Sequence, residues 1–278
     1  MTSRYKKRFA ELKASSCKAF MPFTVLGWPD SETSLTLIKQ MIDANCSALE
    51  LGFAFSDPVA DGPLIQQADF ETLSRGYTVA QGLELIKEVR RYDPHIPIGV
   101  LIYYNLVLAH GAQQFYADAE AAGIDGVLVA DLPVDSASEV APFAQASNID
   151  QIFLVSPVTT DKRLDLITSS ASGFIYLLSR LGVTGTGQRS AVDDQGLNRI
   201  VKSIKDRTDV PVMAGFGISS PANATAMYTA GCDGVISGSK VIEMAAKPDG
   251  TRLLEQFYKD MLSASSYDSE HGKTNVCK

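Results

Sequence analysis

The chain lacks a long hydrophobic run and a cluster of basic residues. Its most apolar segment, 96–109, is shorter than the roughly 20 residues that cross a bilayer. Its N-terminus has no apolar segment of the kind that forms a secretion signal. The net charge of −7 at pH 7 argues against non-specific binding to nucleic acid. We therefore expect a cytoplasmic protein that binds neither membranes nor nucleic acids.

Two sequence signatures of cofactors are also missing. The four cysteines have no CxxC spacing, which argues against a zinc site, and we expect no bound metal. No Gly-x-Gly-x-x-Gly follows the first predicted strand, which argues against a dinucleotide-binding fold. The composition that is present, 45% hydrophobic and 21% charged residues in a chain of 278, is typical of one globular α/β domain.

Short apolar segments alternate with segments of helical periodicity along most of the chain. The apolar segments predict eight buried parallel strands, at 19–27, 49–54, 97–104, 126–132, 151–156, 173–179, 211–217 and 234–237. Eight strand–helix units favour a closed barrel over an open sheet. We therefore predict a (β/α)8 TIM barrel over residues 1–262, with an extra N-terminal helix at 5–13. The polar segment 263–278 has no periodicity, and we expect a disordered tail.

The segment 49–63, LELGFAFSDPVADGP, is the most informative of the sequence. Side chains alternate along a strand, so Glu50 shares a face with the small residues Gly52 and Ala54. That spacing leaves room beside a carboxylate, and Asp61 follows in the next loop. The two carboxylates form a possible general acid–base pair. Alternatively, Glu50 is a buried ion-pair partner and Asp61 is a turn residue or a helix N-cap.

The loops after the later strands carry a second pattern, because the active site of such a barrel lies at the C-terminal ends of its strands. Gly217, Gly238 and Ser239 can expose backbone N–H groups to a phosphate near the start of a short helix, and Gly185 can add another. The alternative is that these glycines only turn the chain. The long loop 181–194 predicts a lid over the site, or else a plain connection.

Apolar side chains are also expected at the mouth of the barrel, where their alternative role is ordinary barrel filling. They are Phe23, Leu101, Leu128, Leu154, Tyr176 and Phe216. A phosphate site, apolar walls and two carboxylates together suit a flat apolar group joined to a phosphorylated tail. The residues alone thus predict acid–base chemistry on a small phosphorylated substrate without a metal.

Six motifs resemble the tryptophan synthase α subunit family, in the order that the family has them. They are the segments 49–63, 128–133, 176–180, 182–185, 215–219 and 237–239. The resemblance runs from about Phe20 to Ile242. It implies a retro-aldol cleavage of indole-3-glycerol phosphate to indole and glyceraldehyde 3-phosphate. It also implies that Glu50 protonates the indole carbon and helps to remove the hydroxyl proton, and that Asp61 binds the indole N–H and stabilises positive charge on the ring. These roles fit the physics, because an apolar barrel should raise the pKa of Glu50, whereas Asp61, on a wetter loop, should stay ionised.

The resemblance assigns roles to further residues. The six apolar residues match the indole pocket, and Gly185, Gly217, Gly238 and Ser239 match the phosphate site. Thr184 matches a lid residue that contacts Asp61 on closure. The family works as an α2β2 complex whose β subunit carries pyridoxal phosphate, so this chain needs no cofactor of its own. On that pattern Asp57, Pro58 and Asn105 face the β subunit. Ala54 and Trp28 depart from the family pattern, which leaves substrate entry and partner contact open at these positions.

Three other readings remain open. The first is the same lyase working alone and releasing free indole. The second is a non-catalytic barrel that activates a β subunit allosterically, which the intact Glu50 and Asp61 disfavour. The third is an isomerase built on another phosphate-binding barrel.

Overall fold

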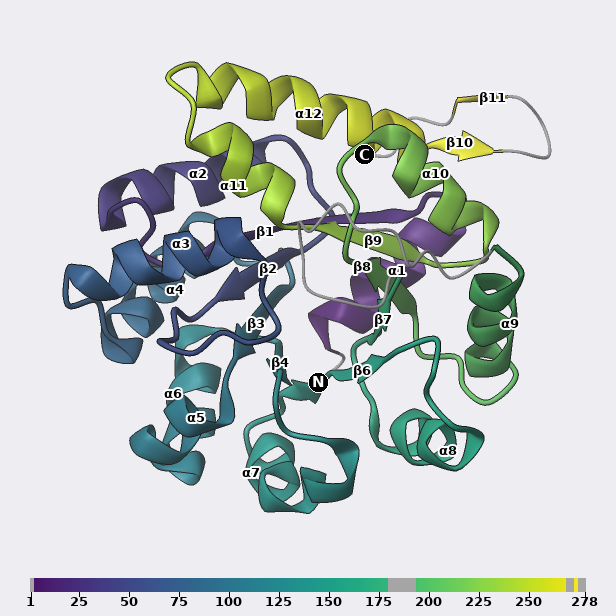
Figure 1. The fold of residues 1–278 in the computed structure, drawn as a ribbon, viewed down its shortest axis with the longest axis horizontal. Helices are drawn as coiled ribbons and strands as arrows, with labels where there is room; N and C mark the ends of the chain where they lie inside the picture. The colour runs from purple at the N-terminus through teal and green to yellow at the C-terminus, as the bar shows by residue number, and fades with distance from the viewer. Residues whose placement is uncertain (1–2, 180–193, 269–272, 275–278) are drawn as a thin grey trace.

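A parallel β-barrel forms the centre of the computed structural model, which describes residues 3–179, 194–268 and 273–274 (Figure 1). Its strands are β1 (Ala19–Val25), β2 (Leu49–Gly52), β3 (Ile98–Ile102), β4 (Gly126–Val129), β5 (Asp150–Gln151), β6 (Phe153–Val155), β7 (Ile175–Leu178), β8 (Val212–Gly215) and β9 (Gly234–Ser237). The hydrogen-bonded order is β5-β4-β3-β2-β1-β9-β8-β7-β6. The predicted α/β barrel is confirmed.

The fifth predicted strand is split into two short strands, β5 and β6. β5 pairs with β4 and β6 pairs with β7, so the two ends of the sheet belong to one continuous stretch of chain. Between them, the backbone N–H of Ile152 donates to the carbonyl of Val127 at 3.1 Å. The nine assigned strands therefore correspond to the eight predicted ones, and this stretch closes the barrel.

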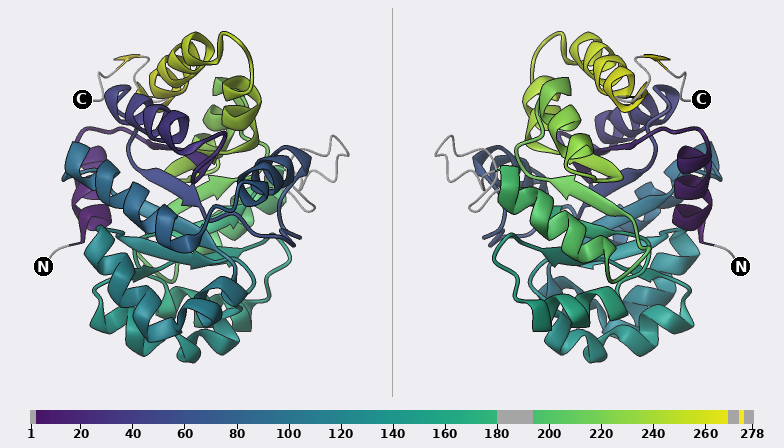
Figure 2. Two further views of the ribbon diagram at one scale, coloured as in Figure 1. Left: turned by 90° about the vertical axis from the view of Figure 1, so that its left-hand side faces the viewer. Right: turned by 90° about the vertical axis from the view of Figure 1, so that its right-hand side faces the viewer.

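Helices surround the barrel (Figures 1 and 2). They are α1 (Arg4–Ala14), α2 (Ser31–Asp43), α3 (Pro63–Ser74), α4 (Val79–Tyr92), α5 (Tyr104–His110), α6 (Ala112–Ala122), the 3-10 helix η1 (Val134–Glu139), α7 (Ala141–Ala146), α8 (Asp161–Ser170), α9 (Asp194–Lys205), α10 (Pro221–Thr229), α11 (Ser239–Ala245) and α12 (Gly250–Ser265). The predicted extra N-terminal helix is α1. No helix in the described part of the chain is long and apolar enough to cross a membrane.

Polar contacts hold α1 against the N-terminal ends of the strands. The Ser3 hydroxyl donates to Asp150 at 2.6 Å, and the Arg4 guanidinium donates to Asp125 at 2.8 Å. Arg90 of α4 donates to the same Asp125 carboxylate at 2.9 Å. Asp125 is only 7% exposed, so these two cations compensate a buried charge.

Tyr5 of α1 extends into the barrel from this end. It is fully buried, and its ring and hydroxyl occupy the space that side chains at Gly99 and Gly126 would need. Gly99 pairs in register with Glu50 on β2. Residues in register on neighbouring strands point to the same side, so Tyr5 fills the barrel in the layer of Glu50.

Several boundaries differ from the sequence-based expectation, and most of the strands are shorter than predicted. The end of the predicted third strand is helical, since α5 begins at Tyr104. The helix expected over 136–147 begins as η1 and continues as α7. The last helix reaches Ser265, beyond the predicted domain end at residue 262. β10 (Tyr267–Asp268) then pairs with β11 (Lys273–Thr274), and the rest of the predicted tail lies outside the described residues.

Candidate active site

Glu50 lies on β2 with its side chain inside the barrel, as the alternation of the sequence predicts. Its register partners are Phe23 on β1 and Gly99 on β3, and only 3% of Glu50 is exposed. No hydrogen bond or ion pair joins its carboxyl group to another residue in the described ranges, which excludes the buried ion pair there. Burial, and then the charge of Asp61, raise the pKa of Glu50 to about 8. The group is therefore protonated at neutral pH and available as a general acid.

Asp61 lies in the loop between β2 and α3. Its carboxylate accepts a hydrogen bond from the Tyr103 hydroxyl at 2.9 Å, and its backbone N–H donates to Pro58 at 3.0 Å. Gly62 is the N-cap of α3, so Asp61 does not cap that helix. The expectation of a wetter loop is wrong, because Asp61 is 7% exposed. Burial raises its pKa to about 6, although the Tyr103 hydrogen bond lowers it, and Asp61 is ionised at pH 7.

Tyr103 is a site residue that the sequence analysis missed. Its hydroxyl also accepts a hydrogen bond from the backbone N–H of Ala60 at 3.2 Å, and its ring stacks on Phe55 at 4.7 Å. The Asp61 loop is thus held by one side chain from the end of β3. A tyrosine at the C-terminal end of the predicted strand 97–104, at the rim that carries the active site, was the signal available in the sequence.

The predicted apolar residues come together above Glu50. Leu101 pairs in register with Gly52 on one side and with Leu128 on the other, which places these side chains inside the barrel. The Tyr176 hydroxyl occupies the position that a Cβ at residue 215 would take, so Gly215 is required there. Tyr176 also meets Phe216 edge-to-face at 6.4 Å. Phe23 and Leu154 lie in register with Glu50 and Tyr176 respectively.

The loops after β8 and β9 bring most of the predicted phosphate-binding residues to one rim. Phe216 and Gly217 have φ values of +71° and +74°, and Phe216 is a bulky residue in a strained backbone conformation. The Ser237 hydroxyl donates to Ile218 at 2.6 Å and ties this loop to β9. Gly238 is the N-cap of α11 and Ser239 is its first residue. Thr184, Gly185 and most of the predicted lid 181–194 lie outside the described residues, which resume at Asp194 where α9 begins.

The predicted partner residues lie on the same rim of the barrel. Asp57 and Asn105 are exposed and Pro58 is half-buried, on the segments after β2 and β3. Exposed apolar side chains accompany them, with Val59 75% and Leu108 52% exposed. This rim therefore presents both polar and apolar groups to the outside.

The two departures from the family pattern have different surroundings. Ala54 is half-buried just after β2. Trp28 is 5% exposed, and its indole N–H donates to Glu71 of α3 at 2.8 Å. Trp28 thus ties the end of β1 to α3.

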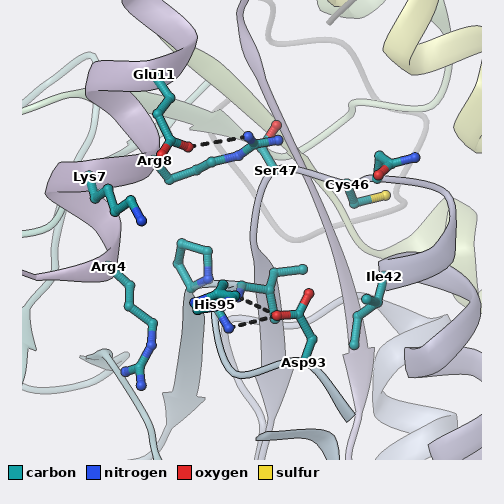
Figure 3. Close-up of a pocket in the computed structure, with 12 residues that line it drawn as sticks. Arg4, Lys7, Arg8, Glu11, Ile42, Cys46, Ser47, Asp93 and His95 are labelled. Carbon is teal, nitrogen blue, oxygen red and sulfur yellow. Dashed lines mark hydrogen bonds and ion pairs between the residues drawn. The ribbon is translucent and has the colours of Figure 1, made fainter. Parts of the chain in front are cut away.

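A cavity of about 240 Å³ lies at the opposite end of the barrel (Figure 3). Arg4, Lys7 and Arg8 of α1 line one side of it, and Asp93 and His95 line another. The active site of a (β/α)8 barrel forms at the C-terminal ends of the strands, so this cavity is separate from it. Nowhere in the described ranges do three or more His, Cys, Asp or Glu side chains come together as metal ligands.

Comparison with known proteins gives one consistent result. The family model described as tryptophan synthase alpha chain matches residues 9–266. The alpha chain of Methanothermobacter thermautotrophicus is 44% identical over 91% of this chain and 93% of its own length. An Escherichia coli alpha chain is 46% identical over 87% of this chain and 89% of its own. Among solved structures, Mycobacterium tuberculosis tryptophan synthase has a TM-score of 0.86 at 30% identity, covering 95% of this chain and 99% of that one. The Legionella pneumophila alpha subunit has a TM-score of 0.86 at 29% identity, covering 95% and 98%.

Proposed function

Because the chain belongs to the family of tryptophan synthase alpha chains, we propose that Glu50 and Asp61 carry out the reaction of that family. The protein is a lyase of tryptophan biosynthesis that cleaves indole-3-glycerol phosphate to indole and glyceraldehyde 3-phosphate. One observation carries the assignment of residues: two buried carboxyl groups at the mouth of the barrel have pKa values of about 8 and about 6. At neutral pH the first is an acid and the second is an anion.

Glu50 supplies and recovers the proton of the reaction. It protonates the indole carbon that bears the glycerol chain, and the positive charge that develops on the ring is stabilised by Asp61 at the indole N–H. The carboxylate of Glu50 then helps to take the proton of the adjacent hydroxyl group. The carbon–carbon bond breaks, its electrons return to the indole ring, and the hydroxyl carbon becomes the aldehyde. Glu50 ends the cycle protonated.

The remaining site residues hold the two ends of the substrate. The indole ring lies among the six apolar residues, with Tyr176 and Phe216 supplying the aromatic wall. The backbone N–H groups of Gly217, Gly238 and Ser239 bind the phosphate. From the family resemblance we add Gly185 to the phosphate site and Thr184 to a lid that closes on Asp61.

The partner is a tryptophan synthase β subunit, as the solved relatives support. We propose an α2β2 complex whose β subunits carry pyridoxal phosphate, with Asp57, Pro58 and Asn105 of this chain at the interface. The exposed Val59 and Leu108 beside them suit a contact surface. A cytoplasmic location fits a biosynthetic lyase that passes its product to a partner subunit.

The proposal is tested by measuring indole release from indole-3-glycerol phosphate. The purified chain alone is expected to release indole slowly. A cognate β subunit is expected to raise the rate of indole release roughly 5- to 150-fold, the usual range of allosteric coupling. A fast rate without the β subunit would identify a stand-alone lyase. Activation of the β subunit without any indole release would identify a non-catalytic partner. No release and no activation would leave another phosphate-binding barrel.

The substitution Tyr103→Phe is expected to shift the acid limb of the pH–rate profile. The variant loses the hydrogen bond that lowers the pKa of Asp61. Asp61 must be ionised to act, so the activity of the variant is lower than that of the unmodified protein at pH 6–7. The difference between the two disappears towards pH 8. A net hydrogen bond of about 1 kcal/mol corresponds to roughly a fivefold effect. The rate of indole release is measured from pH 5.5 to 8, and a profile identical to that of the unmodified protein would contradict the role of Tyr103.

A further inference from the structure

The cavity at the N-terminal end of the barrel takes no part in the proposed reaction. Its walls come from α1, from the end of α2 with the segment that leads into β2, and from the segment 93–97 that leads into β3 (Figure 3). Its volume of about 240 Å³ equals that of roughly eight water molecules in the liquid. The cavity can therefore hold a small organic molecule.

Most polar side chains on these walls are hydrogen-bond donors that the protein itself does not use. Within the described part of the chain, the Lys7 ammonium, the His95 ring and the Asn45 amide have no hydrogen bond or ion pair. In the same ranges the Arg8 guanidinium meets only Glu11, at 3.6 Å, which is too long for a hydrogen bond. In Figure 3, Lys7 and Arg8 extend from α1 into the space between this helix and His95. The cavity thus offers free donors from more than one wall.

Two carboxylates also line the cavity, but neither neutralises these donors fully. Asp93 accepts the backbone N–H groups of His95 at 2.6 Å and Ile96 at 3.0 Å, both on Oδ1. These bonds occupy one of its two oxygens and stabilise its negative charge. Glu11 is half exposed, so water screens its interaction with Arg8. Arg8 therefore keeps the capacity to bind an anion.

Arg4 adds a third positive charge to the lining of the cavity. Its guanidinium binds Asp125 at 2.8 Å, and Arg90 binds the same carboxylate at 2.9 Å. Two cations thus share one carboxylate, which leaves a positive excess beside the cavity. The chain as a whole has a net charge of −7 at pH 7. This cavity is therefore a locally positive site on a negatively charged molecule, and it favours an anionic ligand.

We propose that this cavity binds a small phosphate ester, with the phosphate group between Lys7 and Arg8. A phosphate carries three strong acceptor oxygens, which suit donors that approach from more than one wall. Charge-assisted hydrogen bonds from lysine and arginine are the strong ones in such sites. His95 donates from the opposite wall, and Ile42 and Pro97 pack against the carbon chain of the ester. The inference does not depend on the reaction proposed at the other end of the barrel.

The first test follows the cavity directly by NMR of the histidine rings in the full chain. The chain has three histidines, and the ring signal that disappears in His95→Asn belongs to His95. Glycerol 3-phosphate, added at constant pH and ionic strength, is expected to shift this signal until it saturates. Acetate and chloride at the same ionic strength are expected to leave it nearly unchanged. The absence of a saturable shift at millimolar concentration, or an equal shift with acetate, would overturn the proposal.

The second test removes the two cations one at a time. Lys7→Ala and Arg8→Ala are each expected to weaken the binding seen at His95 about tenfold, since each removes a charge-assisted hydrogen bond to the phosphate. Lys6→Ala is the matched control, because Lys6 is exposed on the same helix and does not line the cavity. It should bind like the unmodified protein. An equal loss in all three variants would reflect only the general charge of α1 and would contradict the site.

Binding at the two ends of the barrel can be told apart. A phosphate ester that enters the active site inhibits indole release, whereas one in this cavity shifts the His95 signal. Inhibition of indole release without any change at His95 would contradict the inference and leave the proposed function standing. A saturable shift at His95 in a protein that releases no indole would support the cavity and count against the proposed function alone.

Discussion

Glu50→Gln is expected to reduce indole release by about 10²- to 10⁴-fold, the usual contribution of a positioned general acid. Glutamine keeps the shape of the side chain but cannot give up a proton in the barrel. The measurement is the rate of indole formation with the β subunit present, at saturating indole-3-glycerol phosphate. Turnover near that of the unmodified protein would remove Glu50 from the mechanism.

The same substitution should leave the fold intact, which separates chemistry from stability. The pKa of Glu50 is raised in the folded protein, so folding takes up a proton between the ordinary glutamate value of 4.5 and about pH 8. Stability of the unmodified protein therefore falls as the pH rises through this window, and glutamine removes that contribution. Thermal unfolding at pH 8 is expected to give Glu50→Gln a Tm no lower than that of the unmodified protein. A large drop in Tm would mean that the lost activity reflects unfolding.

Asp61→Asn is expected to lower indole release by about 10²- to 10³-fold, since it removes a charge from the side of the site where positive charge develops. The effect is smaller than that of Glu50→Gln because the amide oxygen can still accept the indole N–H. A second effect follows from the electrostatics. The charge of Asp61 raises the pKa of Glu50, so the alkaline limb of the profile moves below pH 8 in this variant.

The two effects are measured in one experiment, the pH dependence of kcat for Asp61→Asn and for the unmodified enzyme. Asp206→Asn, which removes an exposed aspartate just after α9, serves as the control. A rate within threefold of normal together with an unmoved alkaline limb would show that Asp61 neither stabilises the reacting ring nor acts on Glu50.

The barrel and the catalytic pair could be predicted because each corresponds to a short local pattern in the sequence. Apolar segments spaced by helical periodicity specify parallel strands, and a glutamate between leucines on a strand must face a closed interior. The burial of Asp61 could not be predicted in this way. A loop rich in proline and glycine indicates exposure, whereas Tyr103 and α3 cover this loop in the folded protein.

The surroundings of the site could not be predicted because they depend on packing between distant parts of the chain. Asp69 follows the pattern of an ordinary helix, and only the packing of α3 on β1 and α11 buries it. Tyr5 lies on a short amphipathic helix whose sequence gives no sign that one ring enters the barrel. The predicted strand 97–104 ran into the first residue of α5, and no helix was predicted over the rest of α5, because its seven residues carry no side-chain cap to mark a helix start.

The contacts that anchor α1 can form only late in the synthesis of this enzyme. α1 is synthesised before its partners, because Ser3 and Arg4 bind residues 147 and 121 positions further along the chain. During synthesis these contacts of α1 cannot form until Asp125 and Asp150 have been translated. Contacts of such long sequence separation also form slowly in refolding. The layer of the barrel that holds Glu50 is therefore complete only when Tyr5 packs against Gly99 and Gly126.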